Sequence, residues 1–241
     1  MFQNKQSEGT YISDVIMPLL RATLSNLPNG HICLSTTECQ SLASKLCIND
    51  GAGKRRIGKK PDIMALEKCE GKLVEYLYLE SSRIICNDTK KNDDETKLWR
   101  ELLDGISYIN SACRPTSNQF GVVGIQVAGE KISLNVLIND AIGIPRYFHV
   151  DHAEIPLTSG ISWRIKPLMR LLLTLRNIII VNKSLLIQAL KQAISHPPRN
   201  VHPSPAVSSP RREERREEPG QKRPRKNSKT RKLTKQKSAH F

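Results

Sequence analysis

Two acidic residues of this 241-residue chain have types and spacing that could hold a metal ion. Residues 61–68 and 72–86 are strand-like runs that a short turn would join as a β-hairpin. In such a hairpin, Asp62 lies opposite Leu79, or opposite Glu80 where a bulge adds one residue. Like charges that face each other destabilise a sheet unless they point into solvent, share a proton or bind a cation.

The chemistry available to such a pair is that of hard divalent cations. Mg²⁺ binds one or two carboxylates and completes its coordination with waters and phosphate oxygens. The ion can then activate a water and stabilise charge on a phosphodiester. A structural interpretation stands beside this one: Asp62 begins a strand or forms a turn, and Glu80 is a solvated charge that pairs with Lys60 or Arg83.

The elements that would position this pair begin with two predicted helices. Apolar residues recur at helical spacing from Ile12 to Leu27, although Pro18 interrupts them, and predict a helix that ends before Pro28. Ser35-Thr36-Thr37-Glu38 has the form of a capping box and predicts a second helix that continues to about Cys47.

The hairpin follows, and a polar loop from Asn87 to Asp93 separates it from a predicted amphipathic helix at residues 94–113. Residues 120–129, 131–140 and 144–157 predict three further strands. Residues 162–195 carry a broad apolar face and predict one or two helices with a break near Asn182. The alternation of helices and strands predicts an α/β fold.

Pro61-Asp62, Glu80-Ser81-Ser82 and the helix after them resemble the PD-(D/E)XK nuclease-like superfamily. Its common core runs helix, strand, strand, helix, strand, and the predicted elements between residues 35 and 129 follow that order. The resemblance implies a restriction-endonuclease-like αββαβ core, in which a mixed sheet is flanked by helices. Residues 60–157 also resemble a group of uncharacterised fungal proteins.

The resemblance implies that Asp62 and Glu80 bind Mg²⁺ or Mn²⁺. The superfamily often places a glutamate of the first helix near the metal, and Glu38 is the candidate here. Glu38 is also suited to a capping role, in which it would partner Ser35.

The lysine of the superfamily motif should stand at position 82, where this chain has Ser82. A hydroxyl carries no charge and cannot replace an ammonium electrostatically. Either catalysis is lost or a basic residue reaches the site from elsewhere, for which the candidates are Arg83, Lys97 and Arg100. The last two are equally suited to pairing with neighbouring acids on the helix surface.

Two further features of the strands have open or negative interpretations. His149 and His152 flank Asp151, but residues i and i+3 of a regular strand point to opposite faces, which argues against a shared metal. Gln126 stands in the middle of an apolar strand, where it would either line the site or bond to a neighbour.

The basic residues suggest a polyanionic partner. The formal charge is +15, of which +10 lies after Ser195, so that residues 1–195 carry only +5. A basic loop before Asp62 would suit a phosphodiester backbone, or would be an ordinary surface loop. It contains Lys54, Arg55, Arg56, Lys59 and Lys60. The tail includes a second patch that fits a nuclear address or a nucleic-acid contact, or else only a solubilising role. This patch consists of Lys222, Arg223, Arg225 and Lys226.

Composition also sets the limits of the domain. Residues 196–241 are rich in Pro, Arg and Lys and are expected to be disordered, residues 1–10 to be a flexible lead-in, and residues 11–195 to form one domain. No CxxC pair, P-loop or dinucleotide fingerprint occurs. Charged residues interrupt the long apolar stretch 161–194, and the start lacks an apolar signal region. We therefore expect an intracellular, nuclear location without a membrane span.

These features together predict a divergent nuclease-like protein that acts on DNA or RNA with Mg²⁺ or Mn²⁺. The alternative is a catalytically inactive module of the same ancestry that binds nucleic acid or another protein.

Overall fold

The computed structural model describes residues 7–36, 39–49, 57–82, 87–113, 115, 118–157 and 162–195. Their helical elements are α1 (Glu8–Tyr11), the π-helical turn η2 (Ile12–Ile16), α2 (Met17–Leu24), α3 (Leu42–Asn49), α4 (Asp88–Ala112) and α5 (Ser162–Ser195). Their strands are β1 (Cys33–Thr36), β2 (Ile63–Cys69), β3 (Lys72–Ser81), β4 (Gly121–Ala128), β5 (Lys131–Asn139) and β6 (Pro145–Glu154).

The strands form one six-stranded mixed sheet in the order β1-β2-β3-β4-β5-β6. β3 and β4 are parallel, and every other neighbouring pair is antiparallel. Parallel neighbours need a crossover connection, and α4 lies on the segment that joins β3 to β4. The prediction of an α/β fold with a mixed sheet flanked by helices is confirmed at this level.

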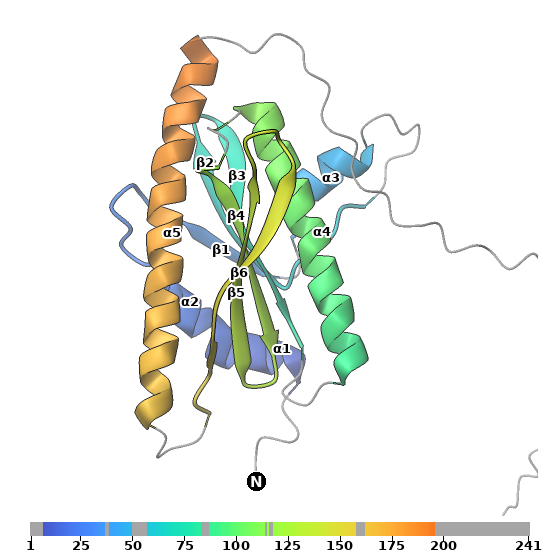
Figure 1. Ribbon diagram of the computed structural model, residues 1–241, viewed down its shortest axis with the longest axis vertical. Coiled ribbons are helices and arrows are strands. Elements are labelled where there is room, and N and C mark those ends of the chain that lie inside the picture. The colour runs from blue at the N-terminus through green and yellow to red at the C-terminus, as the bar shows by residue number, and fades with distance from the viewer. Residues whose placement is uncertain are drawn as a thin grey trace, which may run out of the picture. The chain divides into compact units, whose positions relative to one another are not determined.

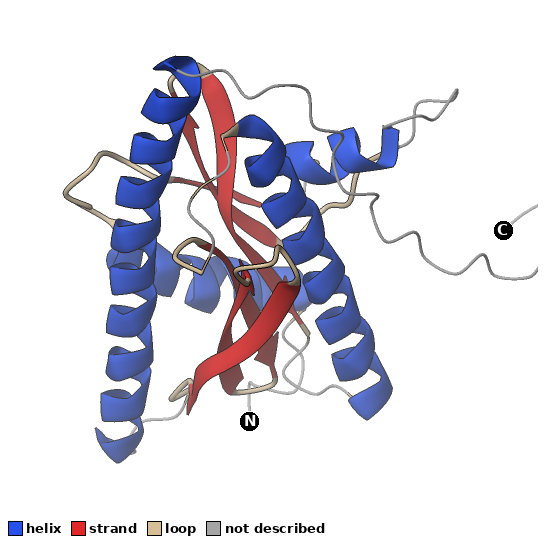
Figure 2. Ribbon diagram, turned by 45° about the horizontal axis from the view of Figure 1, so that its top comes forward, coloured by secondary structure: helices blue, strands red, loops and turns tan. Residues whose placement is uncertain are grey.

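Helices cover both faces of the sheet, with α4 and α5 on opposite sides of the strands (Figure 1; Figure 2). β3 is buried along nearly its whole length, as expected of a strand covered on both faces. α4 approaches the sheet closely at two glycines. A Cβ at Gly105 would stand 2.8 Å from the Tyr78 ring, and one at Gly124 would stand 2.7 Å from Leu102.

The first helical segment begins at Glu8, earlier than predicted, and continues through η2 to Leu24. Proline has no N–H to donate to a helical ladder and crowds the preceding turn. Here the π-helical turn η2 immediately precedes Pro18, and the N–H of Met17 bonds to the carbonyl of Ile12. The wider turn accommodates the proline without ending the segment.

The predicted second helix is present, but its predicted start at Ser35 is wrong. Ser35 and Thr36 belong to β1, which pairs with β2, and α3 begins only at Leu42. The capping group is not local. The carboxylate of Glu75 on β3 accepts hydrogen bonds from the backbone N–H groups of Leu42 (2.6 Å) and Ala43 (3.4 Å).

Glu75 also accepts hydrogen bonds from two hydroxyls, those of Ser41 and Tyr78, each at 2.7 Å. We therefore expect Glu75→Gln to lower the free energy of unfolding by about 1–2 kcal/mol, because an amide offers one acceptor oxygen in place of two. Urea unfolding would measure this against Glu70→Gln in the exposed hairpin turn. Equal midpoints for the two variants would contradict the capping role.

Two other helices differ from their predicted bounds. α4 begins at Asp88 instead of residue 94, because the side chain of Asn87 accepts a hydrogen bond from the N–H of Lys90 at 2.9 Å and caps the helix. α5 is a single helix without the break considered near Asn182. Asn182 is buried, and its amide bonds to the backbone of Gly121, so a polar residue is accommodated within the packed helix.

By length and composition alone, α5 could cross a membrane. About two fifths (39%) of its most apolar window is buried inside the domain, and core helices of soluble proteins pass the same test. Lys183 of this helix is fully buried, pairs with Glu67 at 3.0 Å and donates to the carbonyl of Gly30. The absence of a membrane span stays a prediction.

Candidate functional site

The hairpin brings Asp62 level with Glu80. Both residues of its turn, Glu70 and Gly71, have positive φ (47° and 80°), as tight hairpin turns require. A β-bulge at Tyr76 of β3, opposite Ala65 and Leu66, sets Ile63 opposite Leu79, so the residue before Ile63 comes level with Glu80. This is the bulged alternative of the two registers that the sequence predicted.

Asp62 is buried at the start of β2, with 8% of its surface exposed. Its carboxylate accepts a hydrogen bond from the backbone N–H of Ser81 at 2.8 Å. Burial raises the pKa of Asp62, and the bond from Ser81 and the charge of Lys97 oppose that shift. The neighbouring strand β3 therefore holds the Asp62 carboxylate in place.

Lys97 of α4 supplies a positive charge directly at Glu80. Its Nζ lies 2.7 Å from Oε2 of Glu80 and also donates to the carbonyl of Lys60 at 3.2 Å. Burial would lower the pKa of Lys97, but the hydrogen bond and the charge of Glu80 outweigh it, so the pKa is raised. Within the described part of the chain, Arg100 forms no ion pair with either acid. Arg83 lies outside the described residues.

Ser82 itself is fully buried and bonded to α4. Its Oγ donates to Oδ2 of Asp94 at 2.5 Å, and Lys90 pairs with the other oxygen of Asp94 at 2.7 Å. The hydroxyl at the position of the motif lysine therefore fastens the end of β3 to the helix that carries Lys97.

Glu101, one helical turn after Lys97, was not predicted as a site residue. It is 1% exposed, and neither of its oxygens has a hydrogen-bond partner among the described residues; the same is true of Oε1 of Glu80. The available signal was its position on the apolar face of α4, between Leu98 and Leu102.

Glu80 and Glu101 lie close enough together that each influences the ionisation of the other. Burial and the charge of Glu80 raise the pKa of Glu101 to about 9. Burial and the charge of Asp62 raise the pKa of Glu80 to about 7, while Lys97 lowers it. Because Lys97 pairs with Glu80, Glu101 is the acid that holds its proton more tightly.

Gln126 was expected either to line the site or to bond to a neighbour, and it does both. It pairs with Glu80 across β3 and β4, so the two side chains share a face of the sheet. Its Nε2 donates to the carbonyl of Lys91 on α4 at 2.8 Å. The amide therefore lies beside the acidic pair while bonding to the covering helix.

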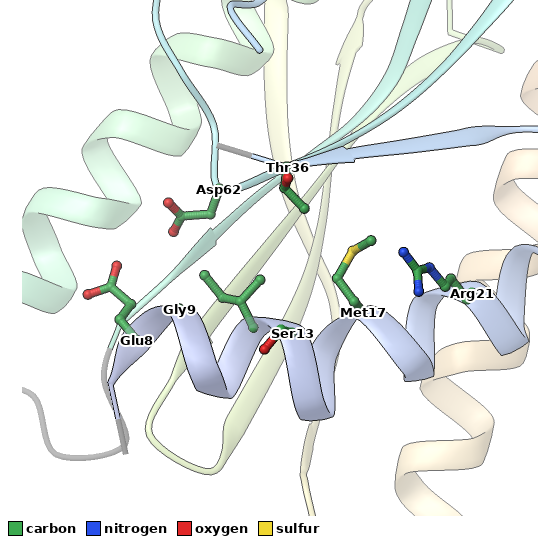
Figure 3. Close-up of a pocket in the computed structure, with 8 residues that line it drawn as sticks. Glu8, Gly9, Ser13, Met17, Arg21, Thr36 and Asp62 are labelled. Carbon is green, nitrogen blue, oxygen red and sulfur yellow. The ribbon is translucent and has the colours of Figure 1, made fainter. Parts of the chain in front are cut away.

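A pocket of about 410 Å³ opens beside Asp62, between the first helical segment and β1. Glu8 of α1 lines it, and Figure 3 shows the carboxylates of Glu8 and Asp62 at one end and Arg21 at the other. The sequence prediction assigned the acid of the first helix to Glu38, which lies outside the described residues. Glu8 was missed, although an acid at the start of the first helix was visible in the sequence.

The predicted basic residues have different outcomes. Lys59 forms an ion pair with Asp104 at 2.9 Å, so its charge serves an internal contact. Lys60 is exposed and meets Lys97 only through its carbonyl. The remaining basic residues predicted to bind nucleic acid lie outside the described residues: Lys54, Arg55, Arg56, Lys222, Arg223, Arg225 and Lys226.

The acids beside Lys97 are ligands of the type that a hard divalent cation uses. Asp62 and Glu80 are two neighbouring carboxylates, and Oε1 of Glu80 is buried without a partner among the described residues. In the described part of the chain, no three His, Cys, Asp or Glu side chains are grouped to hold a metal. Two carboxylates are a donor set that Mg²⁺ can use, because it keeps several waters and binds through one or two carboxylates.

No protein-family model, curated protein or solved structure matches the chain. The function is accordingly argued from the geometry of these side chains.

Proposed function

We propose that this protein is a divergent member of the PD-(D/E)XK nuclease-like superfamily that hydrolyses phosphodiesters of DNA or RNA with Mg²⁺ or Mn²⁺. The contact between Lys97 and Glu80 carries this proposal. It supports a compensated site, in which an ammonium from α4 supplies the charge that Ser82 lacks.

The order of elements supports the same ancestry. α3, β2, β3, α4 and β4 follow one another as helix, strand, strand, helix, strand, with Asp62 directly before the first strand and Glu80 on the second. β3 and β4 are parallel, and the crossover helix α4 between them packs against both strands.

In this proposal Asp62 and Glu80 hold the cation, which when bound supplies a water of lowered pKa and positive charge for the phosphate. The protein's own groups prepare the site. Ser81 orients the Asp62 carboxylate, and Lys97 favours the ionised form of Glu80 and adds positive charge. Burial of both acids strengthens these electrostatic interactions because little water screens them.

Cleavage of mixed single- and double-stranded DNA and RNA by the full chain tests the proposal. We expect cleavage that requires Mg²⁺ or Mn²⁺, stops with chelator and is lost in Asp62→Ala and Glu80→Ala. Mn²⁺ should also raise the melting temperature of the wild type but not of Asp62→Ala, because ligands stabilise the state they bind. Metal-independent cleavage, or cleavage by Asp62→Ala and Glu80→Ala at the rate of the wild type, would disprove the proposed site.

The alternative function is an inactive nucleic-acid-binding or protein-interaction module, which the uncharged Ser82 favours. It predicts no cleavage under any metal condition. Binding of labelled DNA or RNA that weakens steeply with salt would then separate nucleic-acid binding from a protein-interaction role. We also propose that the protein is nuclear and that its basic tail contributes to nucleic-acid binding.

A further inference from the structure

We infer that His149 and His152 form an exposed two-histidine site for a borderline first-row divalent cation such as Ni²⁺, Cu²⁺ or Zn²⁺. The pair lies on β6, the edge of the sheet opposite β1, and is independent of the proposed nuclease site. Nε2 of His149 and Nδ1 of His152 stand 3.2 Å apart.

A β-bulge brings these two side chains together and corrects the expectation that they point to opposite faces. β6 shifts register between Asp151 and His149, so that His152 pairs with Ser133 and His149 pairs with Asn135. The extra residue, Val150, offsets the alternation of a regular strand. The two imidazoles therefore share a face, with their ring centroids 5.5 Å apart.

Asn135 sets the tautomer of His149. Its side-chain oxygen lies 3.0 Å from Nδ1 of His149, and an amide oxygen can only accept, so Nδ1 carries the proton. A neutral His149 then presents the lone pair of Nε2 toward His152. Metal-binding histidines commonly use such a partner on the second nitrogen, and Asn135 is itself buried and fixed.

The spacing of the facing nitrogens suits coordination of one ion. Two imidazole nitrogens at about 2.0–2.1 Å from a metal are about 2.9 Å apart at a right angle and about 3.4 Å apart at the tetrahedral angle. The observed 3.2 Å lies between these values. Imidazole nitrogen suits nickel, copper and zinc, whereas magnesium prefers oxygen.

The site would be open to solvent. Both histidines are exposed, and no third His, Cys, Asp or Glu joins them in the described part of the chain. Asp151 does not serve as a ligand, because both of its oxygens bind Arg170 at 3.1 Å. Water or a small ligand would complete the coordination, which leaves positions for exchange.

Calorimetric titration of the full chain with Ni²⁺ tests this inference. We expect one Ni²⁺ site in the wild type. Its affinity should fall in both His149→Gln and His152→Gln. The fall should exceed the roughly 10–100-fold loss that follows removal of an outer hydrogen-bond partner of a ligand. His31→Gln, an exposed histidine elsewhere, is the matched control and should bind like the wild type. Circular dichroism would establish that each variant is folded.

A second readout locates the ion. Paramagnetic Ni²⁺ should broaden the imidazole resonances of His149 and His152 in the wild type before those of other histidines. Equal Ni²⁺ affinity in the two variants and the wild type, or first broadening at a histidine outside β6, would overturn the inference.

Discussion

Replacement of Lys97 by methionine is expected to reduce metal-dependent cleavage about 10²–10³-fold, which is the usual cost of removing one preorganised charge-stabilising donor. Lys97 reaches Glu80 at 2.7 Å and is the basic residue that α4 directs to the acidic pair. Methionine keeps the length and apolar stem but removes the ammonium. Initial rates under saturating Mn²⁺ would measure the loss.

Two matched variants sharpen this prediction. Lys97→Arg keeps the charge and should retain more activity than Lys97→Met, whereas Lys91→Met removes a charge elsewhere on α4 and should be close to the wild type. Cleavage by Lys97→Met at the rate of Lys91→Met would contradict the compensating role.

Lys97→Met should also lower the free energy of unfolding by about 2 kcal/mol. Breaking a fully buried ion pair costs about 3–5 kcal/mol, but the side chain of Lys97 is 39% exposed, and solvent screening reduces the effect. A stable domain stays folded after a loss of this size. Activity measured below the unfolding transition therefore reports the effect of Lys97→Met on catalysis and not its effect on stability.

The second large effect is expected for Glu101→Gln, which should stabilise the protein at alkaline pH. The folded pKa of Glu101 is raised to about 9 from its ordinary value of 4.5, because the carboxyl is buried beside Glu80. Between these pH values the folded state keeps a proton that the unfolded state has released. Its contribution to stability is present below about pH 4.5 and is lost as the pH rises through about 9.

Glutamine preserves the shape of Glu101 and cannot ionise, so this loss should disappear. We expect the free energy of unfolding of Glu101→Gln to exceed that of the wild type by about 1–4 kcal/mol at alkaline pH, the range seen when buried ion pairs are replaced by well-packed apolar residues. Urea unfolding from about pH 5 to 9 would measure it, with the exposed Glu95→Gln of the same helix as control. A constant difference between variant and wild type across this range would contradict the expected titration.

Several features of the fold could be predicted because their causes are local. Strand alternation and the turn at Glu70-Gly71 predicted the hairpin and the possible bulge that brings Asp62 beside Glu80. Helical periodicity predicted the buried face of α4. The departure at Ser82 predicted either lost catalysis or a basic residue from elsewhere, with Lys97 and Arg100 of that helix among the candidates. The alternating pattern of strands and helices predicted the α/β class, and the family resemblance implied a mixed sheet.

Other features depend on contacts between distant segments. Cys33–Thr36 became a strand because the edge of β2 was available to pair with it, and α3 begins where Glu75 supplies a cap from another strand. A local capping pattern cannot reveal either partner. The bulge at Val150 likewise depends on the pairing of β5 with β6, and it reversed the expected separation of the two histidines.

The sequence by itself determined which residues of the hairpin could hold a cation and that the motif position lacks a charge. Only the tertiary structure decided that Lys97, of the described candidates, reaches Glu80. It also decided that Glu8 lies near Asp62 and Glu101 near Glu80. The reason is that side-chain type and periodicity are properties of one segment, whereas distance and burial arise when α1, α4 and the sheet pack together.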